Sequence, residues 1–427
     1  MKWFGVKGDA WDGNPSPTDD TAAIQLSIDT LQTLLGTSNL TGNQTISEST
    51  GDLYFPAGFY STRTITINSI SSGTNNEIAN INFIGAGIMS TVFVGRSQYF
   101  LAPPGSGATV SIPINVIPII NCLNQNTTFK DFAIKGNYIP LMEPYGIIED
   151  SPSGYYYWLG PGFENIGINV QGKSVCNFER ISIVGCSIGI NILGNVFSNV
   201  TQCIFGSQRS CWALDSSNHW VSHSFELGNN FGIYIDRDPN APYSLANKVS
   251  VFESRFYGNH IWGIYFANGS MLQINVCDFE PNGDLMDSPF IGNPNTGAIC
   301  IAQNITEMRP PLIVNITGTW FERNLGYTIY YNSDGAVIFN LNNCYFLGTN
   351  VMDFSYGVLI DTVSPTSTDI KKVNILGCYS DISTNSGSIV GGFVLDIEEA
   401  NIIGSTILYQ NINSSAIATN TQFYKIP

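Results

Sequence analysis

The segment Val276–Gly283, with the sequence VCDFEPNG, decides the fold. It combines a short strand pattern, an aromatic residue and, shortly after it, an asparagine. The same unit recurs through the second half of the chain, so a repeat architecture must be considered before any local element. Its copies are TQCIFG (201–206), SHSFELGNN (222–230), ESRFYGNH (253–260), GTWFERN (318–324) and NCYFLGTN (343–350).

A second apolar unit that begins with glycine accompanies these copies. Both units alternate with period two, so neither can bury its apolar face alone and each needs a stacked neighbour. The glycine spacing indicates about one coil for every 21 to 34 residues. The longer step from Gly189 to Gly232 is interpreted as two coils, with CWAL (211–214) in the slot between them. The units begin at Gly189, Gly232, Gly263, Gly297, Gly326, Gly357 and Gly391.

Stacking these units predicts an all-β parallel β-helix, in which each strand pairs with its equivalent one coil away at about 4.8 Å. The aromatic residue of each unit then points inward. Cys203, Cys277 and Cys344, two residues earlier, share that face and are interpreted as a packed column of small apolar side chains. Asparagine tolerates the left-handed conformation and can bond along a stack, which predicts a ladder. The predicted ladder consists of Asn229, Asn259, Asn282, Asn324 and Asn350.

The start of the chain carries a helical pattern that the rest lacks. Thr18, Asp19 and Asp20 are typical of a helix N-cap. An open end of a β-helix exposes core and unpaired backbone, so we expect this helix to cover it. The predicted organisation is a cap over residues 1–50 and a β-helix body with inserted loops over residues 51–427. The apolar face of the helix consists of Ala22, Ala23, Ile24, Ile28 and Leu31.

Three stretches at this end resemble a known family. FGVKGDA (4–10), TDDTAAIQLSID (18–29) and LYFPAGFY (53–60) are similar to the N-terminal signature of the pectate-lyase-superfamily right-handed β-helices, especially viral tailspikes and polysaccharide depolymerases. The resemblance implies a right-handed coil, a homotrimer on the virion surface or otherwise extracellular, and degradation of host-surface polysaccharide. The family's KGDG loop is replaced here by a longer segment with a tryptophan, KGDAWDGNPSPTDD (7–20). Tailspikes carry a particle-attachment segment before the signature, whereas this chain begins at it.

Composition narrows the classes of partner. The 427 residues carry a net charge of -16 with only 12% charged residues, so the field of the protein repels nucleic acid and anionic membranes. No apolar run predicts insertion into a membrane, and MKWFGVKG (1–8) lacks the core of a secretory signal. Either the chain is not exported by that route or its natural start lies upstream. The nine cysteines lack zinc-like spacing, and no metal or other cofactor is predicted.

Residues on either side of an inward aromatic must face outward, which predicts two surface columns. Flat rings and paired carboxyl groups are what a sugar-cleaving site needs. We therefore predict catalytic carboxylates and substrate contacts in these columns. The first column is Ser224, Arg255, Asp278, Trp320 and Tyr345, and the second is Glu226, Tyr257, Glu280, Glu322 and Leu347. The predicted catalytic residues are Glu280, Glu322, Asp278 and Glu226, and the predicted substrate contacts are Trp320, Tyr257, Tyr345 and Arg255.

The spacing of the carboxylates bears on mechanism. If Phe279 and Phe321 lie one coil apart, Glu280 and Glu322 stack at about 5 Å, and one pKa of such a pair should rise. That separation suits a retaining hydrolase, whereas Glu226 and Glu280, two coils apart at about 10 Å, suit an inverting one. Both alternatives stay open. Each glutamate also has a simpler interpretation, as a residue that solvates a turn or pairs with a nearby arginine.

Other features are less specific. The aromatic loop SPSGYYYWLGPGF (151–163), with Tyr156 and Trp158, is interpreted either as a glycan contact or as a contact with a sister subunit. Asp236 and Asp238 are an incomplete set of calcium ligands. His223 shares the inward parity of its neighbour two residues on, which favours a buried structural role.

Three functions fit these patterns. The leading hypothesis is an enzyme of a viral particle that hydrolyses polysaccharide. The second is a polysaccharide lyase, which needs a strong base and a cation to neutralise a uronic carboxylate. The excess of acidic residues counts against such an anionic substrate. The third is a non-catalytic spike that binds glycan for receptor recognition or serves a structural role.

Overall fold

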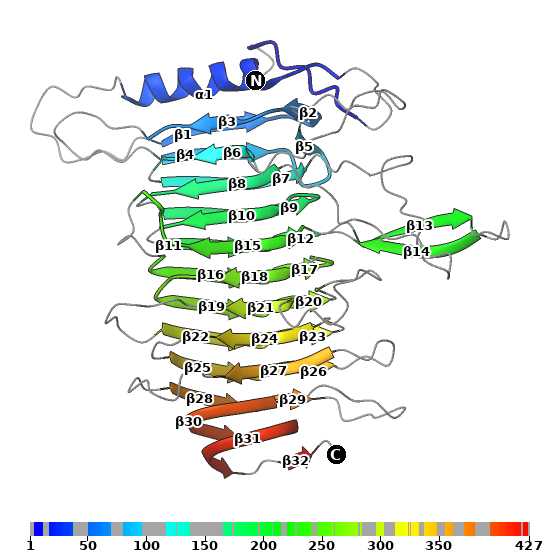
Figure 1. Cartoon of the computed structure of the whole chain (residues 1–427). Helices are drawn as coiled ribbons and strands as arrows, with labels where there is room; N and C mark the ends of the chain where they lie inside the picture. Colours follow the sequence, from blue (N-terminus) through cyan, green and yellow to red (C-terminus); the bar gives the residue numbers. More distant parts are fainter. Residues whose placement is uncertain are drawn as a thin grey trace, which may run out of the picture.

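The computed structural model shows a stack of β-coils with a single described helix, α1 (Thr21–Gly36), across its N-terminal end (Figure 1). The predicted parallel β-helix with an N-terminal helix is confirmed. Among the described residues no helix has the length and apolar character needed to cross a bilayer. The structure describes residues 4–11, 17–36, 50–69, 80–95, 117–124, 126–136, 165–172, 175–194, 197–206, 208–214, 220–226, 229–240, 246–259, 261–280, 282–283, 296–302, 312–322, 324, 326–332, 337–347, 355–361, 371–380, 393–419 and 422–425.

Three faces of parallel strands make up the stack, and each strand pairs with its equivalent one coil away. Face 1 consists of β1 (Thr50–Phe55), β4 (Asn80–Gly85), the first parts of β7 (Asn126–Lys135) and β9 (Val175–Val184), β11 (Phe197–Thr201), β16 (Lys248–Phe252), β19 (Met271–Asn275), β22 (Leu312–Thr317), β25 (Val337–Asn342) and β28 (Lys371–Leu376).

Face 2 carries the outward columns of interest, and face 3 closes each coil. Face 2 consists of β2 (Gly58–Thr62), β5 (Thr91–Gly95), the later parts of β7 and β9, β12 (Ile204–Phe205), β17 (Arg255–Tyr257), β20 (Asp278–Glu280), β23 (Trp320–Glu322), β26 (Tyr345–Leu347) and β29 (Tyr379–Ser380). Face 3 consists of β3 (Ile65–Ile67), β6 (Ile117–Cys122), β8 (Asn165–Gln171), β10 (Ile188–Leu193), β15 (Phe231–Asp236), β18 (Trp262–Phe266), β21 (Gly297–Ile301), β24 (Gly326–Asn332) and β27 (Ser355–Asp361). The last coils continue in β30 (Phe393–Ile403), β31 (Thr406–Thr419) and β32 (Gln422–Lys425).

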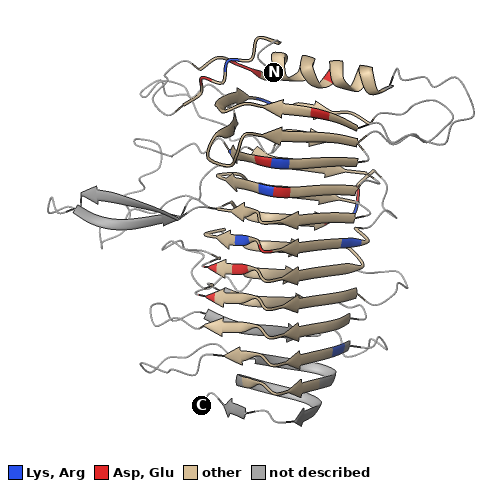
Figure 2. Ribbon diagram, turned by 180° about the vertical axis from the view of Figure 1, so that it is seen from behind, with Lys and Arg blue, Asp and Glu red and all other residues tan. Residues whose placement is uncertain are grey.

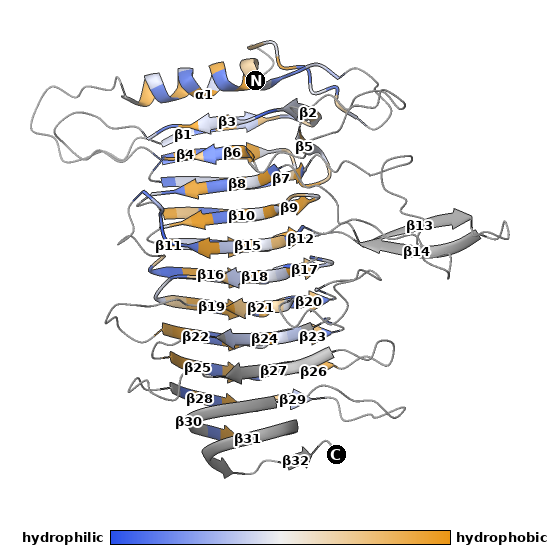
Figure 3. Cartoon of the chain, viewed as in Figure 1, coloured by the Kyte–Doolittle hydropathy of each residue, from blue (hydrophilic) through white to orange (hydrophobic). Residues whose placement is uncertain are grey.

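A column of stacked phenylalanines lines the inside of face 2. Phe279 stacks on Phe256 and on Phe321, with ring centroids 4.5 and 5.2 Å apart. Phe205 and Phe346 extend the column at 4.9 and 5.1 Å. Phe279 pairs in register with Phe321, which confirms that these residues occupy neighbouring coils with the same orientation. Such ring pairs contribute about 0.5–1.5 kcal/mol each beyond the free energy of the area they bury. The column forms because apolar and polar residues alternate along the strands (Figure 3).

The corner between face 1 and face 2 is a single residue with positive φ in successive coils. Its backbone N–H donates to a carbonyl of the next coil; for example, Val276 donates to Thr317 at 2.9 Å and Gly318 donates to Asn342 at 2.8 Å. This conformation favours glycine and asparagine. The corner residues are Asp131, Arg180, Gln202, Glu253, Val276, Gly318, Asn343, Gly377 and Gly404.

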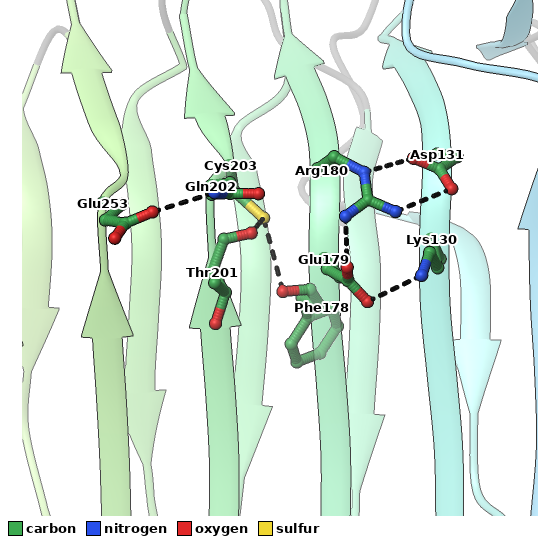
Figure 4. A network of polar contacts seen from close by, with 9 residues as sticks. All are labelled: Lys130, Asp131, Phe178, Glu179, Arg180, Thr201, Gln202, Cys203 and Glu253. Carbon is green, nitrogen blue, oxygen red and sulfur yellow. Dashed lines mark hydrogen bonds and ion pairs between the residues drawn. The ribbon is translucent and has the colours of Figure 1, made fainter.

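Charged corner residues in the first half of the stack pair with one another along the column (Figure 4). The Arg180 guanidinium donates to both carboxylate oxygens of Asp131, at 2.6 and 3.0 Å, and also to Glu179. Lys130 forms an ion pair with Glu179 at 3.1 Å. Because donors and acceptors match coil by coil, this network is accounted for by stacking and needs no ligand.

The predicted asparagine ladder is present inside the stack. Asn229 donates to Asn259 at 3.2 Å, Asn259 to Asn282 at 2.7 Å, and Asn282 to Asn324 at 3.0 Å, and all four side chains are buried. The second N–H of Asn282 donates to the Phe256 carbonyl at 2.9 Å. Asn350, the fifth predicted member, lies outside the described residues. A second ladder on the half-exposed surface of face 1 was not predicted, and it joins Asn315, Asn340, Asn374 and Asn401.

The cap is held to the first coil by apolar and polar contacts. α1 packs against β1 and β3, with Ile24 and Ile28 buried in the core. Asp19 accepts the Thr21 amide at 3.1 Å and so acts as the helix cap. Asp20 does not cap the helix with its side chain, because its carboxylate accepts the amides of Lys7 and Gly8 at 2.8 and 3.0 Å. The first two stretches of the N-terminal signature, 4–10 and 18–29, therefore bind each other.

One repeat unit is not a rung of the stack. β13 (Gln208–Leu214) and β14 (Trp220–Glu226) form an antiparallel hairpin that projects from the coils, with Glu226 opposite Gln208 (Figure 1). β10 pairs directly with β15, so the step from Gly189 to Gly232 is one coil and the prediction of two coils is wrong. A hairpin strand has the same period-two alternation as a rung, and periodicity cannot tell them apart. The predicted burial of His223 concerns a side chain outside the described set.

The buried and surface asparagine ladders are expected to differ in their contribution to stability. Asn282→Ala leaves the Asn259 amide hydrogen and the Phe256 carbonyl without these partners inside the stack, which should lower the free energy of unfolding by about 1–3 kcal/mol. Asn340→Ala, the matched control, should cost less than about 1 kcal/mol because water replaces the lost bonds. Denaturant unfolding followed by circular dichroism measures both, and equal losses would contradict the role of the buried ladder.

Candidate functional site

The outward side of face 2 brings charged and aromatic residues together in its C-terminal half. Arg255 lies opposite Asp278, Asp278 opposite Trp320, and Trp320 opposite Tyr345 in successive coils. Figure 2 shows that charged residues are sparse on the described coils and that those of β17, β20 and β23 lie along one edge of the stack. The register therefore confirms the predicted columns for these coils.

Asp278 is a carboxyl group of this cluster with a perturbed pKa. The Tyr257 hydroxyl donates to its Oδ2 at 3.0 Å, whereas Oδ1 is buried without a hydrogen-bond partner among the described residues. Burial raises the pKa of Asp278, and the nearby charge of Glu322 raises it further, while the Tyr257 hydroxyl and Arg255 oppose the rise. Burial and the charge of Asp278 likewise raise the pKa of Tyr257 to about 12. Asp278 is thus easier to protonate than an ordinary aspartate.

Glu322 and Glu280 supply the other carboxylates of the cluster. The indole N–H of Trp320 donates to Glu322 Oε2 at 3.1 Å, which orients this carboxylate on the outer surface. Tyr257 lies opposite Glu280 in the preceding coil. The sequence led us to expect a raised pKa within the Glu280–Glu322 pair, and this stays a prediction. The structure adds Asp278, whose pKa is raised mainly by burial.

Aromatic side chains continue the first column toward the C-terminus. Trp320 and Tyr345 stack with ring centroids 5.5 Å apart and are 40% and 46% exposed. Tyr379 follows at 6.1 Å from Tyr345. Tyr379 was not predicted because its unit, GCYSD (377–381), has Ser380 where the other units have a phenylalanine. The pair Cys378–Tyr379, which repeats Cys344–Tyr345, was the available signal.

Several predicted site residues are elsewhere. Glu226 and Ser224 belong to β14 of the hairpin, so neither stands in the columns, and the proposed inverting pair Glu226–Glu280 at two-coil spacing is wrong. Tyr156 and Trp158 lie outside the described residues. Within the described part of the chain, no group of three or more His, Cys, Asp or Glu residues is arranged to hold a metal ion.

Comparisons place the fold among known parallel β-helices. No family model and no curated protein matches the sequence. The enzymatically active domain of tailspike protein 2 from bacteriophage CBA120 is similar, with a TM-score of 0.52 and 12% identity over 95% of this chain and 50% of that chain. The A-module of mannuronan C-5 epimerase AlgE6 from Azotobacter vinelandii is similar, with a TM-score of 0.50 and 12% identity over 99% of this chain and 98% of that chain.

A third solved structure, ORF18 of Geobacillus virus E2, has a TM-score of 0.48 and 17% identity. The comparison covers 99% of this chain, which spans 59% of the length of that viral protein. At these identities the likeness shows the fold alone. The predicted parallel β-helix fold is thus confirmed by these comparisons.

The raised pKa of Asp278 has a consequence for stability. A carboxyl group whose pKa is higher in the folded than in the unfolded state contributes stability at low pH that is lost as pH rises through the folded pKa. Asparagine cannot ionise, so Asp278→Asn does not lose stability as the pH rises. The variant should therefore melt about 1 °C or more above the wild type at pH 7.5 and show no such gain at pH 4. Thermal unfolding at both pH values tests this, with the exposed Asp52→Asn as control; a gain confined to pH 4 would contradict it.

Proposed function

We propose that this protein binds a host-surface polysaccharide and cleaves it by acid–base glycoside hydrolysis. The observation that carries the proposal is the half-buried Asp278, with its raised pKa, beside Glu280, Glu322 and the exposed indole of Trp320. Glycoside hydrolysis needs a protonated carboxyl group to donate to the leaving oxygen and an ionised one to attack the anomeric carbon or activate water. Two carboxyl groups whose environments push their pKa values apart can divide these roles.

In this proposal Asp278 is the proton donor. Its burial favours the protonated form, which is the form that a proton donor needs. Glu322, held by the indole N–H, acts as the ionised partner. Glu280 remains a candidate for the same role, since it lies two residues after Asp278 on the same outward side of β20.

Neutral glycans fit the cluster better than uronic acids. Arg255 is the only cation on the described parts of β17, β20, β23 and β26, against three carboxylates. An eliminating lyase must neutralise a uronic carboxylate before it removes the adjacent proton. The similar epimerase module is named for mannuronan, a polysaccharide, and supports a glycan as the ligand class without favouring elimination here.

The biological setting is part of the same proposal. The similar tailspike domain is viral, and the net charge of -16 disfavours nucleic acid and anionic membrane as partners. We propose a homotrimer on the virion surface, with residues 1–50 as the cap and residues 51–427 as the body of each subunit. A spike that binds glycan without cutting it is the second candidate, because the Trp320–Tyr345 stack serves recognition equally well.

Substitution of the proposed acid tests for catalysis. Asp278→Asn should reduce reducing-end release from a cleaved polysaccharide by at least about a hundredfold while glycan binding persists, because proton donation contributes about 10²–10⁴-fold. A panel of surface polysaccharides, with chain length followed by size-exclusion chromatography, identifies the substrate. Binding without any cleavage by the wild type supports the non-catalytic spike, and products absorbing near 235 nm, as the alkene left by elimination does, identify a lyase.

Tyr257→Phe tests the assignment of the acid through its pH profile. The Tyr257 hydroxyl stabilises the Asp278 carboxylate, so its removal should raise the pKa of Asp278. The alkaline limb of activity, which reports loss of the donated proton, should move to higher pH by roughly 0.5–1 unit. A limb that moves to lower pH, or does not move, would exclude Asp278 as the donor. Tyr54→Phe, an exposed tyrosine of β1, is the control.

A further inference from the structure

One corner residue does not suit its conformation. Val276 has a φ of 54°, in the left-handed region where a β-branched side chain is strained against its own backbone. The four coils that follow place better-suited residues at the same corner: Gly318, Asn343, Gly377 and Gly404 all have φ values between 51° and 61°. The coil that precedes has Glu253, which is not β-branched. Valine is therefore the least favourable choice at this position.

Core packing does not account for the valine. Its side chain is 62% exposed, so it does not compensate for the strain by filling space inside the stack. A strained backbone conformation persists where the surrounding contacts hold it in place, and residues with such a conformation are often found at ligand sites. An exposed apolar side chain on strained backbone thus points to a contact that is made only when a ligand is present.

The position of Val276 indicates which ligand it meets. It stands two residues before Asp278, at the entry to β20. Its Cγ2 lies 3.7 Å from where a Cβ on Gly318 would stand, so the side chain leans toward the corner of the next coil, which leads into Trp320. The Asp278 position is therefore bordered by Val276 in its own coil and by Trp320 in the next.

We infer that Val276 is a substrate contact that determines specificity, with its methyl groups packed against the apolar C–H face of the sugar unit held over Asp278. Trp320 offers the second apolar surface beside the same unit. A pyranose ring presents such a face when its hydroxyl groups are equatorial, which defines the class of sugar that this position accepts. The inference rests on the proposed polysaccharide site and adds a residue that the outward columns do not include.

The experiment replaces Val276 with residues that fit the corner. Val276→Asn and Val276→Gly relieve the strain, so both variants should melt about 1–2 °C above the wild type. Both lose the apolar contact, so the dissociation constant for the cleaved polysaccharide should rise about fourfold to fifteenfold, as expected for one or two methyl groups. Affinity electrophoresis in polysaccharide gels and isothermal titration calorimetry measure the affinity.

Gln202→Asn is the matched control. Gln202 stands at the same corner with a φ of 55°, on the coil that precedes Arg255. Asparagine should be tolerated there without any change in affinity. If the Val276 variants bind as tightly as the wild type, or if they are less stable than it, the inference is overturned while the proposed function stands. If the wild-type protein binds no polysaccharide of the panel, the proposed function fails and the inference with it.

Discussion

Hydrogen bonds between successive coils are the interaction on which the rest of the structure depends. Each rung pairs its backbone groups with rungs about 4.8 Å away, on all three faces and at the corners between them. Because this spacing is nearly uniform, a side chain lies directly over its equivalent in the preceding coil. Residues that are far apart along the chain therefore become neighbours in columns, whatever the length of the loops that connect them.

The columns have opposite consequences inside and outside the stack. Inside, like groups attract one another: phenylalanine stacks on phenylalanine, and each asparagine donates to the next. Outside, the same register brings carboxylates together, as it does for Asp278 and Glu322. The structure offsets this repulsion with the Tyr257 hydroxyl and the Trp320 indole N–H rather than with a full set of cations. The repetition that stabilises the core thus brings carboxylates close together on the surface.

Two unfavourable features coincide at β20. Asp278 is a half-buried carboxyl group with one oxygen that has no partner in the described part of the chain, and Val276 is an exposed β-branched residue on left-handed backbone. Elsewhere along the corner the residues are glycine, asparagine, or polar and charged residues that bond to their neighbours, as Arg180 does to Asp131 and Gln202 to Glu253. Sequences that are otherwise consistent with their fold tend to break local rules at functional sites, so the coincidence supports the location of the proposed site independently of any similarity.

Much of the fold and part of the site were predictable from local pattern. The spacing of Phe279 and Phe321 indicated neighbouring coils, and the columns through Arg255, Asp278, Glu280 and Glu322 followed from alternation. Glu226 was misplaced, because a hairpin strand alternates as a rung does. Tyr379 was missed, because its unit lacks the phenylalanine used to recognise the others.

The sequence by itself determined which residues of a rung face inward or outward, since alternation is a property of an extended backbone. Only the tertiary structure decided which segments are rungs, which carboxyl group is buried, and that Val276 leans toward the coil of Trp320. Those properties arise from neighbours one coil away, and loops of variable length separate these neighbours in the sequence. A local sequence pattern therefore does not show which segments become neighbours in successive coils.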